Sequence, residues 1–228
     1  AGSIDSPMHG AEMAECYWLA LTRDVPFDDY PFDPLVRQAV DDLRTLPGFE
    51  WVTPENVFRG RLPGDSTGPY VSQFLLLDIP YGPMVIPQRL CMPVPGNHWM
   101  TSYAEWLAVQ NGGVAGSIVH EPTFRHIANG ASLAEFVHGD FSYQAFLDAA
   151  LILLPHGVNA LDPGNPYRAS RRQGGFVTFG GPAILDLVAR AARDALMAVW
   201  FQKWQVHRKL RPEAYGGVVE NTLNRGVW

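Results

Sequence analysis

Proline and glycine are spread along the whole chain, and this feature constrains the fold most strongly. The 228 residues include 19 prolines and 22 glycines. Proline breaks the interior of a helix, and glycine there costs about 1 kcal/mol relative to alanine. Regular elements must therefore lie between these residues and be joined by long irregular connections. No stretch shows the strong alternation of a half-buried strand, although 74–79 is apolar enough for either a strand or a helix. The sequence thus predicts a mainly α protein.

Six segments carry apolar residues at helical spacing. We expect helices over 10–22, 34–45, 67–77, 101–110, 132–154 and 182–210. Capping signals support two of the starts, namely Thr101 or Ser102 with Glu105, and Ser132 with Glu135. The last segment is the clearest, because nothing interrupts it between Pro182 and Pro212. We expect this helix to end at 210 or 211 and the chain beyond Pro212 to be a loop.

Composition and charge exclude several classes of protein. Hydrophobic residues make up 47% of the chain and charged residues 18%, which is not typical of a disordered protein. The formal net charge of −6 gives little support to a general nucleic-acid binder. The longest apolar run, 149–155, is far shorter than the roughly 20 residues of a membrane-spanning helix. The histidines and the two cysteines show no metal-ligand spacing, so we expect no metal ligands in this chain.

Positive charge is concentrated near the end of the last predicted helix. Both lysines of the chain, Lys203 and Lys209, lie in 190–211 together with four arginines and a single acid, Asp194. On a continuous helix His207 and Arg211 would lie about 40° and 80° from Lys203 on the helical wheel. The three side chains could then reach one cleft.

The tryptophans of this segment suggest how the basic residues are used. Trp200 and Trp204 flank the face that carries Lys203, so we expect that face to be largely buried. Buried cations need compensation, and a bound oxyanion would supply it. The alternative is a basic last turn that complements the helix dipole. Arg208 and Lys209, on the other face, fit that alternative.

The spacing of two of these residues resembles a known signature. Lys203, seven intervening residues and then Arg211-Pro212 resemble the first active-site signature of the vanadium-dependent haloperoxidases, which the type-2 phosphatidic acid phosphatase superfamily shares. The stretch 199–217 is similar to the bromoperoxidase branch in particular. Further similar blocks, in order along nearly the whole chain, are 12–20, 58–65, 68–74, 103–112, 161–167 and 178–182. The resemblance implies a helical-bundle haloperoxidase architecture.

The resemblance also implies the roles of individual residues. Lys203 and Arg211 match the catalytic positions that hydrogen-bond the oxygens of vanadate. The family's motif gives His207 no ligand role, so His207 either lies behind these two residues, as we expect for Trp204, or is a structural histidine. Some relatives hold calcium near 162–173, but Asp162 is the only carboxylate in that loop, which argues against a calcium site.

The resemblance is incomplete, because two later signatures of the family are missing. Neither a Ser-Gly-His segment nor an Arg followed by the vanadium-binding His occurs before Trp228. The chain also lacks an initiator Met, so we expect a processed, tagged or truncated product. Residues 1–228 would be the N-terminal and central part of a haloperoxidase-like domain. We expect activity only with a complementary C-terminal polypeptide that carries both signatures.

The activity that the resemblance implies is vanadate-dependent oxidation of halide, with bromide favoured, by hydrogen peroxide to hypohalous acid. Small organic molecules would be halogenated, the protein would form a homo-oligomer, and peroxide chemistry on halides suggests export. Two alternatives remain open: a phosphatase-like hydrolase that uses the same oxyanion site, and a non-catalytic helical subunit whose basic patch binds an anion or a partner.

Overall fold

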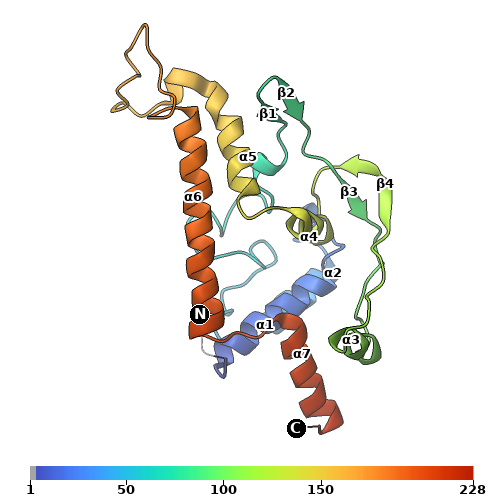
Figure 1. Cartoon of the computed structure of the whole chain (residues 1–228). Coiled ribbons are helices and arrows are strands. Elements are labelled where there is room, and N and C mark those ends of the chain that lie inside the picture. Colours follow the sequence, from blue (N-terminus) through green and yellow to red (C-terminus); the bar gives the residue numbers. More distant parts are fainter. Residues whose placement is uncertain (1–3, 228) are drawn as a thin grey trace.

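The computed structural model describes residues 4–227 and confirms a mainly α protein (Figure 1). Its helices are α1 Pro7–Leu21, α2 Pro34–Leu43, α3 Tyr103–Gln110, α4 Gly130–Gly139, α5 Gln144–Leu153, α6 Gly181–Trp200 and α7 Pro212–Glu220. The helices α1, α2 and α3 confirm three of the predicted segments. No helix within residues 4–227 combines the length and the apolar character needed to cross a membrane.

The helix α2 shows why its segment was predictable. The carboxylate of Asp33 accepts hydrogen bonds from the backbone N–H groups of Leu35 and Val36, at 2.8 and 3.0 Å, and so caps the helix. Pro34 occupies the first turn, where its missing N–H costs nothing. The helix then buries one apolar stripe at helical spacing, formed by Val36, Ala39, Val40 and Leu43.

The hydrophobic core lies where this stripe meets α1 and the connection that follows α2. Its buried members include Ala11 of α1, Tyr30 before α2, and Val52 and Val57 after it. Tyr30 is 1% exposed, and its ring makes edge-on contacts with the rings of Phe27 and Tyr70. The N-terminal third of the chain therefore holds the best-packed part of the described structure.

Two small antiparallel sheets are present that the sequence did not predict. The strands β1 Ile79–Tyr81 and β2 Met84–Ile86 form a hairpin, in which Gly82 adopts the positive φ of +59° that its tight turn needs. The strands β3 Leu90–Pro93 and β4 His120–Arg125 form the second pair, with a register shift between 91 and 93. Strands this short, with β2 exposed throughout, carry no usable alternation.

The expected helix over 67–77 is wrong. The structure has only a 3-10 turn, Gln73–Leu75, in that stretch. Gly68 lies in the left-handed region with φ +90°, and the residue before a proline is biased away from helical backbone. The alternative of a strand over 74–79 also fails, because β1 begins only at 79.

The expected helix over 132–154 is two helices. After Gly139 the backbone of Asp140 is extended, which ends α4, and α5 begins four residues later. The predicted capping pair is also wrong, because Ser132 acts as the partner of the cap rather than as the cap. The side chain of Asn129 accepts from the Ser132 N–H at 2.9 Å, and the Ser132 hydroxyl accepts from the Asn129 N–H at 3.1 Å.

Candidate functional site

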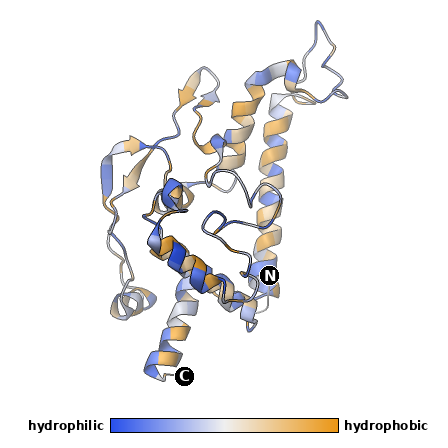
Figure 2. Ribbon diagram, turned by 180° about the vertical axis from the view of Figure 1, so that it is seen from behind, coloured by the Kyte–Doolittle hydropathy of each residue, from blue (hydrophilic) through white to orange (hydrophobic). Residues whose placement is uncertain are grey.

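The helix α6 carries the basic segment and stands at one side of the molecule, beside α5 (Figure 1). Figure 2 shows apolar residues along its length. None of its residues is buried, and Leu187, Met197 and Trp200 are 66%, 54% and 55% exposed. Within residues 4–227, therefore, the apolar side chains of α6 are left largely uncovered.

The helix changes its winding where the basic residues begin. Beyond Trp200 the chain continues as a π-helical segment, Phe201–Val206, in which the N–H of His207 donates to the carbonyl of Gln202 at 2.9 Å. Such wider turns occur often at functional sites. The prediction of one α-helix to 210 or 211 is wrong, and the wheel angles that placed Lys203, His207 and Arg211 on one face do not apply.

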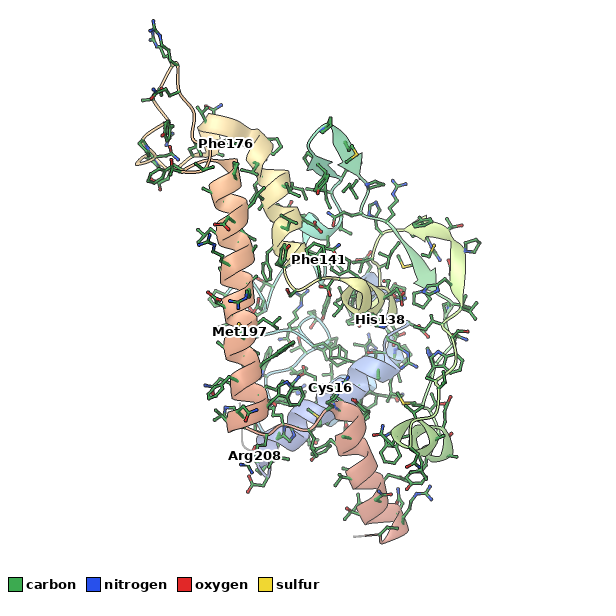
Figure 3. The ribbon with its side chains drawn as sticks, viewed as in Figure 1. Cys16, His138, Phe141, Phe176, Met197 and Arg208 are labelled. Carbon is green, nitrogen blue, oxygen red and sulfur yellow. The ribbon has the colours of Figure 1, made fainter. Side chains whose placement is uncertain are left out.

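A tight turn over 207–211 follows the π-helical segment. Arg208, which is labelled at the foot of α6 in Figure 3, has a left-handed backbone with φ +47°. The N–H of Lys209 donates to the carbonyl of Lys203 at 3.0 Å, which closes the turn. Arg211 is then extended, with φ −71° and ψ 152°, as the residue before a proline prefers. Lys203 and Arg211 thus lie on the two sides of this turn.

The segment after Pro212 is helical, which corrects the expectation of a loop. Pro212 opens α7, and a π-helical segment, Asn221–Arg225, follows it. Proline fits the first turn of a helix as well as it ends a preceding one. The helix α7 therefore begins directly after Arg211 and points the positive end of its dipole towards the turn.

The side chains of Lys203 and Arg211 are both exposed. The Nζ of Lys203 lies 4.6 Å from the centroid of the Trp204 ring, a cation–π contact. The Nε of Arg211 lies 2.7 Å from Oε1 of Glu213, and the arginine side chain is 71% exposed. Across residues 4–227, no hydrogen bond, ion pair or ring contact joins Lys203 to Arg211.

The aromatic face around Lys203 is open in this chain. Trp200 and Trp204 are 55% and 40% exposed, so the expected burial of this face is wrong for the described residues. His207 is half-buried. Lys203 has no carboxylate partner in the part of the chain that the structure describes, and it is free to bind an oxyanion from outside.

Lys209 has a different role from the one expected. It forms an ion pair with Glu12 of α1, and its side chain is only 15% exposed. The Oε2 of Glu12 also lies 3.8 Å from Nδ1 of His9, a fully buried histidine. Burial raises the pKa of the neighbouring Glu15 carboxyl, and the charge of Glu12 raises it further. Nothing in the local pattern around 209 indicated a partner almost 200 residues earlier in the chain.

Two aromatic side chains hold the start of α7. The Tyr17 hydroxyl of α1 donates to the carbonyl of Pro212 at 2.6 Å. The indole N–H of Trp106 in α3 donates to the carbonyl of Glu213 at 2.9 Å. Both rings lie against glycines, because a Cβ at Gly216 or Gly217 would collide with them. Neither aromatic residue was expected to matter for the site.

The donor set fits an oxyanion better than a bare metal ion. Lys203 offers a point charge and Arg211 a planar fork, which together suit tetrahedral oxyanions. No cluster of three or more His, Cys, Asp or Glu side chains in residues 4–227 could hold a metal ion. These residues can therefore contact the oxygens of vanadate or phosphate, but they offer no ligand set for vanadium itself.

Comparisons with known proteins extend over nearly the whole chain. No family model matches it. The chain is 34% identical to the vanadium-dependent bromoperoxidase of Corallina pilulifera, over 95% of this chain and 44% of that protein. It is 33% identical to the vanadium-dependent bromoperoxidase of Ascophyllum nodosum, over 97% of this chain and 42% of that protein.

A solved structure agrees with these sequence matches. The homohexameric second vanadate-dependent bromoperoxidase of Ascophyllum nodosum superposes with a TM-score of 0.84 and 32% identity, over 99% of this chain and 39% of that one. The chain spans less than half the length of each of these relatives. In sequence and in fold, it is related over nearly all of its length to the vanadium-dependent bromoperoxidases.

Proposed function

We propose that the protein containing this chain oxidises halide, bromide in particular, with hydrogen peroxide in a vanadate-dependent reaction. The observation that carries the proposal is the similarity to bromoperoxidases over at least 95% of the chain, together with two exposed cations beside one turn. When bound, vanadate supplies a Lewis-acidic centre that activates hydrogen peroxide towards halide.

The residues of this chain bind and polarise the oxyanion. The ammonium group of Lys203 donates hydrogen bonds to an oxygen and withdraws negative charge from it. The guanidinium of Arg211 neutralises charge on neighbouring oxygens, and the start of α7 adds its partial positive charge there. Preorganised donors of this kind lower the barrier because they need no reorganisation during the reaction.

Other parts of the site would come from polypeptide outside this sequence. Two observations support this proposal: the chain spans less than half of each relative, and α6 leaves large apolar side chains uncovered within the described residues. An apolar helix face of this kind is typical of an interface with another element. We propose that the covering polypeptide brings the ligand of the vanadium, and that the protein forms a homo-oligomer, as the Ascophyllum structure does.

The test compares three variants of the protein as its gene encodes it, assayed for bromide oxidation at saturating orthovanadate. Loss of one preorganised donor costs about 10²–10³ in rate, so Lys203→Ala and Arg211→Ala should each lose that much. The control is Arg190→Ala, which removes an exposed cation of α6 that pairs with Asp186 at 3.0 Å. Arg190→Ala should retain wild-type activity, and wild-type activity in either of the other two variants would overturn the proposal.

The donor set itself favours one alternative, because phosphate is a tetrahedral oxyanion of the same charge type. A phosphatase would hydrolyse a phosphate monoester and show no bromide oxidation in any amount of vanadate. Lys203→Ala and Arg211→Ala would then lose hydrolysis, and Arg190→Ala would retain it. This result would move the assignment to the hydrolase.

A further inference from the structure

The turn between Lys203 and Arg211 holds an unfavourable backbone conformation. Arg208 has φ +47°, a left-handed conformation that residues with a Cβ rarely adopt. Such a residue keeps this conformation only when its surroundings impose it. The contacts on either side of Arg208 therefore determine where the two cations lie.

The first contact is the ion pair between Lys209 and Glu12. Lys209 follows Arg208 directly in the chain, and its side chain is 15% exposed. The backbone N–H of Lys209 donates to the carbonyl of Lys203 at 3.0 Å. The carboxylate of Glu12 is thus linked to Lys203 through a single residue, although it touches no exposed cation of the site.

The second contact is the hydrogen bond from Tyr17 to the carbonyl of Pro212, at 2.6 Å. It lies one residue after Arg211. Tyr17 and Glu12 both belong to α1, which runs past the foot of α6 and the start of α7 (Figure 1). Gly216 leaves room for Tyr17 beside α7, since a Cβ at position 216 would collide with the Tyr17 hydroxyl. The helix α1 therefore contacts the turn at Lys209 and the residue that follows the turn, Pro212.

We propose that Glu12 and Tyr17 are positioning residues that set the separation of Lys203 and Arg211 for an oxyanion. The inference rests on the proposed function, because it assigns these two residues to the same site. Neither residue would touch the oxyanion. Each acts through the backbone of the turn: Glu12 through Lys209, and Tyr17 through Pro212. Residues that orient the ligands of a metal ion contribute about 10–100-fold to its affinity, and we expect an effect of the same order here.

The test measures the affinity for orthovanadate by isothermal titration calorimetry, on the protein as its gene encodes it. Glu12→Gln removes the charge that holds Lys209, and we expect the Kd to rise about 10–100-fold. Tyr17→Phe removes one hydroxyl and keeps the ring, and we expect a smaller rise. The affinity for inorganic phosphate, titrated in parallel, should fall in the same order across the variants, because both anions need the same cation spacing.

Matched controls make the same chemical changes away from the turn. Asp186→Asn removes a carboxylate that pairs with Arg190, and its Kd should equal that of the wild type. Tyr103→Phe removes a hydroxyl that donates to Asn221 at 2.8 Å, beyond the far end of α7, and its Kd should also be unchanged.

A rescue variant separates positioning from a general effect on stability. Arg208→Gly lets the turn keep its left-handed backbone without steric cost, since glycine adopts positive φ readily. In the Glu12→Gln background it should recover most of the lost affinity. Asp33→Ala, which removes a helix cap remote from the turn, should lower the Tm and leave the Kd unchanged.

The outcomes distinguish this inference from the proposed function. If Glu12→Gln and Tyr17→Phe bind orthovanadate as tightly as the wild type while Lys203→Ala loses binding, the positioning role is wrong and the function stands. If Lys203→Ala also binds normally, the proposed function itself fails. Should Glu12→Gln not fold, Tyr17→Phe decides alone, because an unchanged Kd in that variant overturns the inference.

Discussion

The helices α2 and α6 differ in what covers their apolar residues. The stripe of α2 is buried against α1 and the following connection, with Val36, Ala39 and Leu43 each 0% exposed. The helix α6 is twice as long and has no buried residue. Both sequences have helical periodicity, so periodicity alone does not say whether a partner for the apolar face is present in the same chain.

This contrast divides the described molecule by role. The region around α2 is closed and well packed. The region from α6 to α7 is open, and the side chains of Lys203 and Arg211 are exposed. The contrast supports our proposal that α6 and the turn belong to a site which further polypeptide completes. Four predictions test how sharp the division is.

The largest effect is expected in the core. Leu43→Ala should lower the free energy of unfolding by about 2–5 kcal/mol, because it leaves a cavity at a side chain with no exposure. Urea denaturation measures this loss. The matched control is Leu62→Ala, at a side chain that is 69% exposed, which should change the value by less than about 0.5 kcal/mol. Equal losses in the two variants would erase the contrast between core and surface.

The second effect is a loss of stability at high pH. Burial raises the pKa of Tyr30 to about 12, and the nearby Tyr70 adds to this while a hydrogen bond with Thr22 opposes it. The unfolded tyrosine ionises near pH 10, so the folded state keeps its proton where the unfolded state does not.

Stability should therefore fall between about pH 10 and pH 12, by on the order of 2 kcal/mol. Denaturation at a series of pH values measures the slope. Tyr30→Phe should flatten the curve in this window, and a curve equally steep in the variant would show that another group is responsible.

The third effect is the loss of the cap of α2. Asp33→Ala removes the acceptor for two backbone N–H groups and should cost about 1 kcal/mol. A shift of the urea midpoint with an unchanged slope is the expected sign of a local loss. Asp29→Ala, at a nearby acid in the 3-10 turn before α2, serves as the control and should cost less.

The smallest effect is expected on α6. Asp186→Asn breaks an ion pair in which both side chains are more than half exposed, and should cost less than about 0.5 kcal/mol. The cost should shrink further at high salt. A loss as large as that of Asp33→Ala would contradict the view that this face of α6 contributes little to the stability of the chain.

The elements that the sequence predicted well carry their signals locally. The helix α2 has a cap, a proline in its first turn and a regular apolar stripe, all within 33–43. The predicted cap of α3 is also confirmed, since the hydroxyl of Ser102 accepts from the N–H of Glu105 at 3.3 Å. In such cases local propensity and packing favour the same structure.

The elements that the sequence missed depend on contacts far along the chain. The break at 207–211 is held by residues of α1, so no pattern near Arg208 could reveal it. Pro212 opens α7, a role that the sequence did not predict, and the preceding helical segment already ends at Val206. Lys203 and Arg211 are indicated by the local concentration of positive charge and by a signature-like spacing, and their place in the site stays a prediction. Lys209 was assigned to the helix dipole, because its partner Glu12 lies in a distant helix.

The most direct test of the central claim is bromide oxidation by hydrogen peroxide before and after removal of vanadate, on the protein as its gene encodes it. We predict that activity is lost when vanadate is removed and returns when orthovanadate is added. We also predict that added vanadate restores no activity to Lys203→Ala. Bromide oxidation that persists unchanged without vanadate, or that Lys203→Ala retains in full, would contradict the assignment of this turn to a vanadate site.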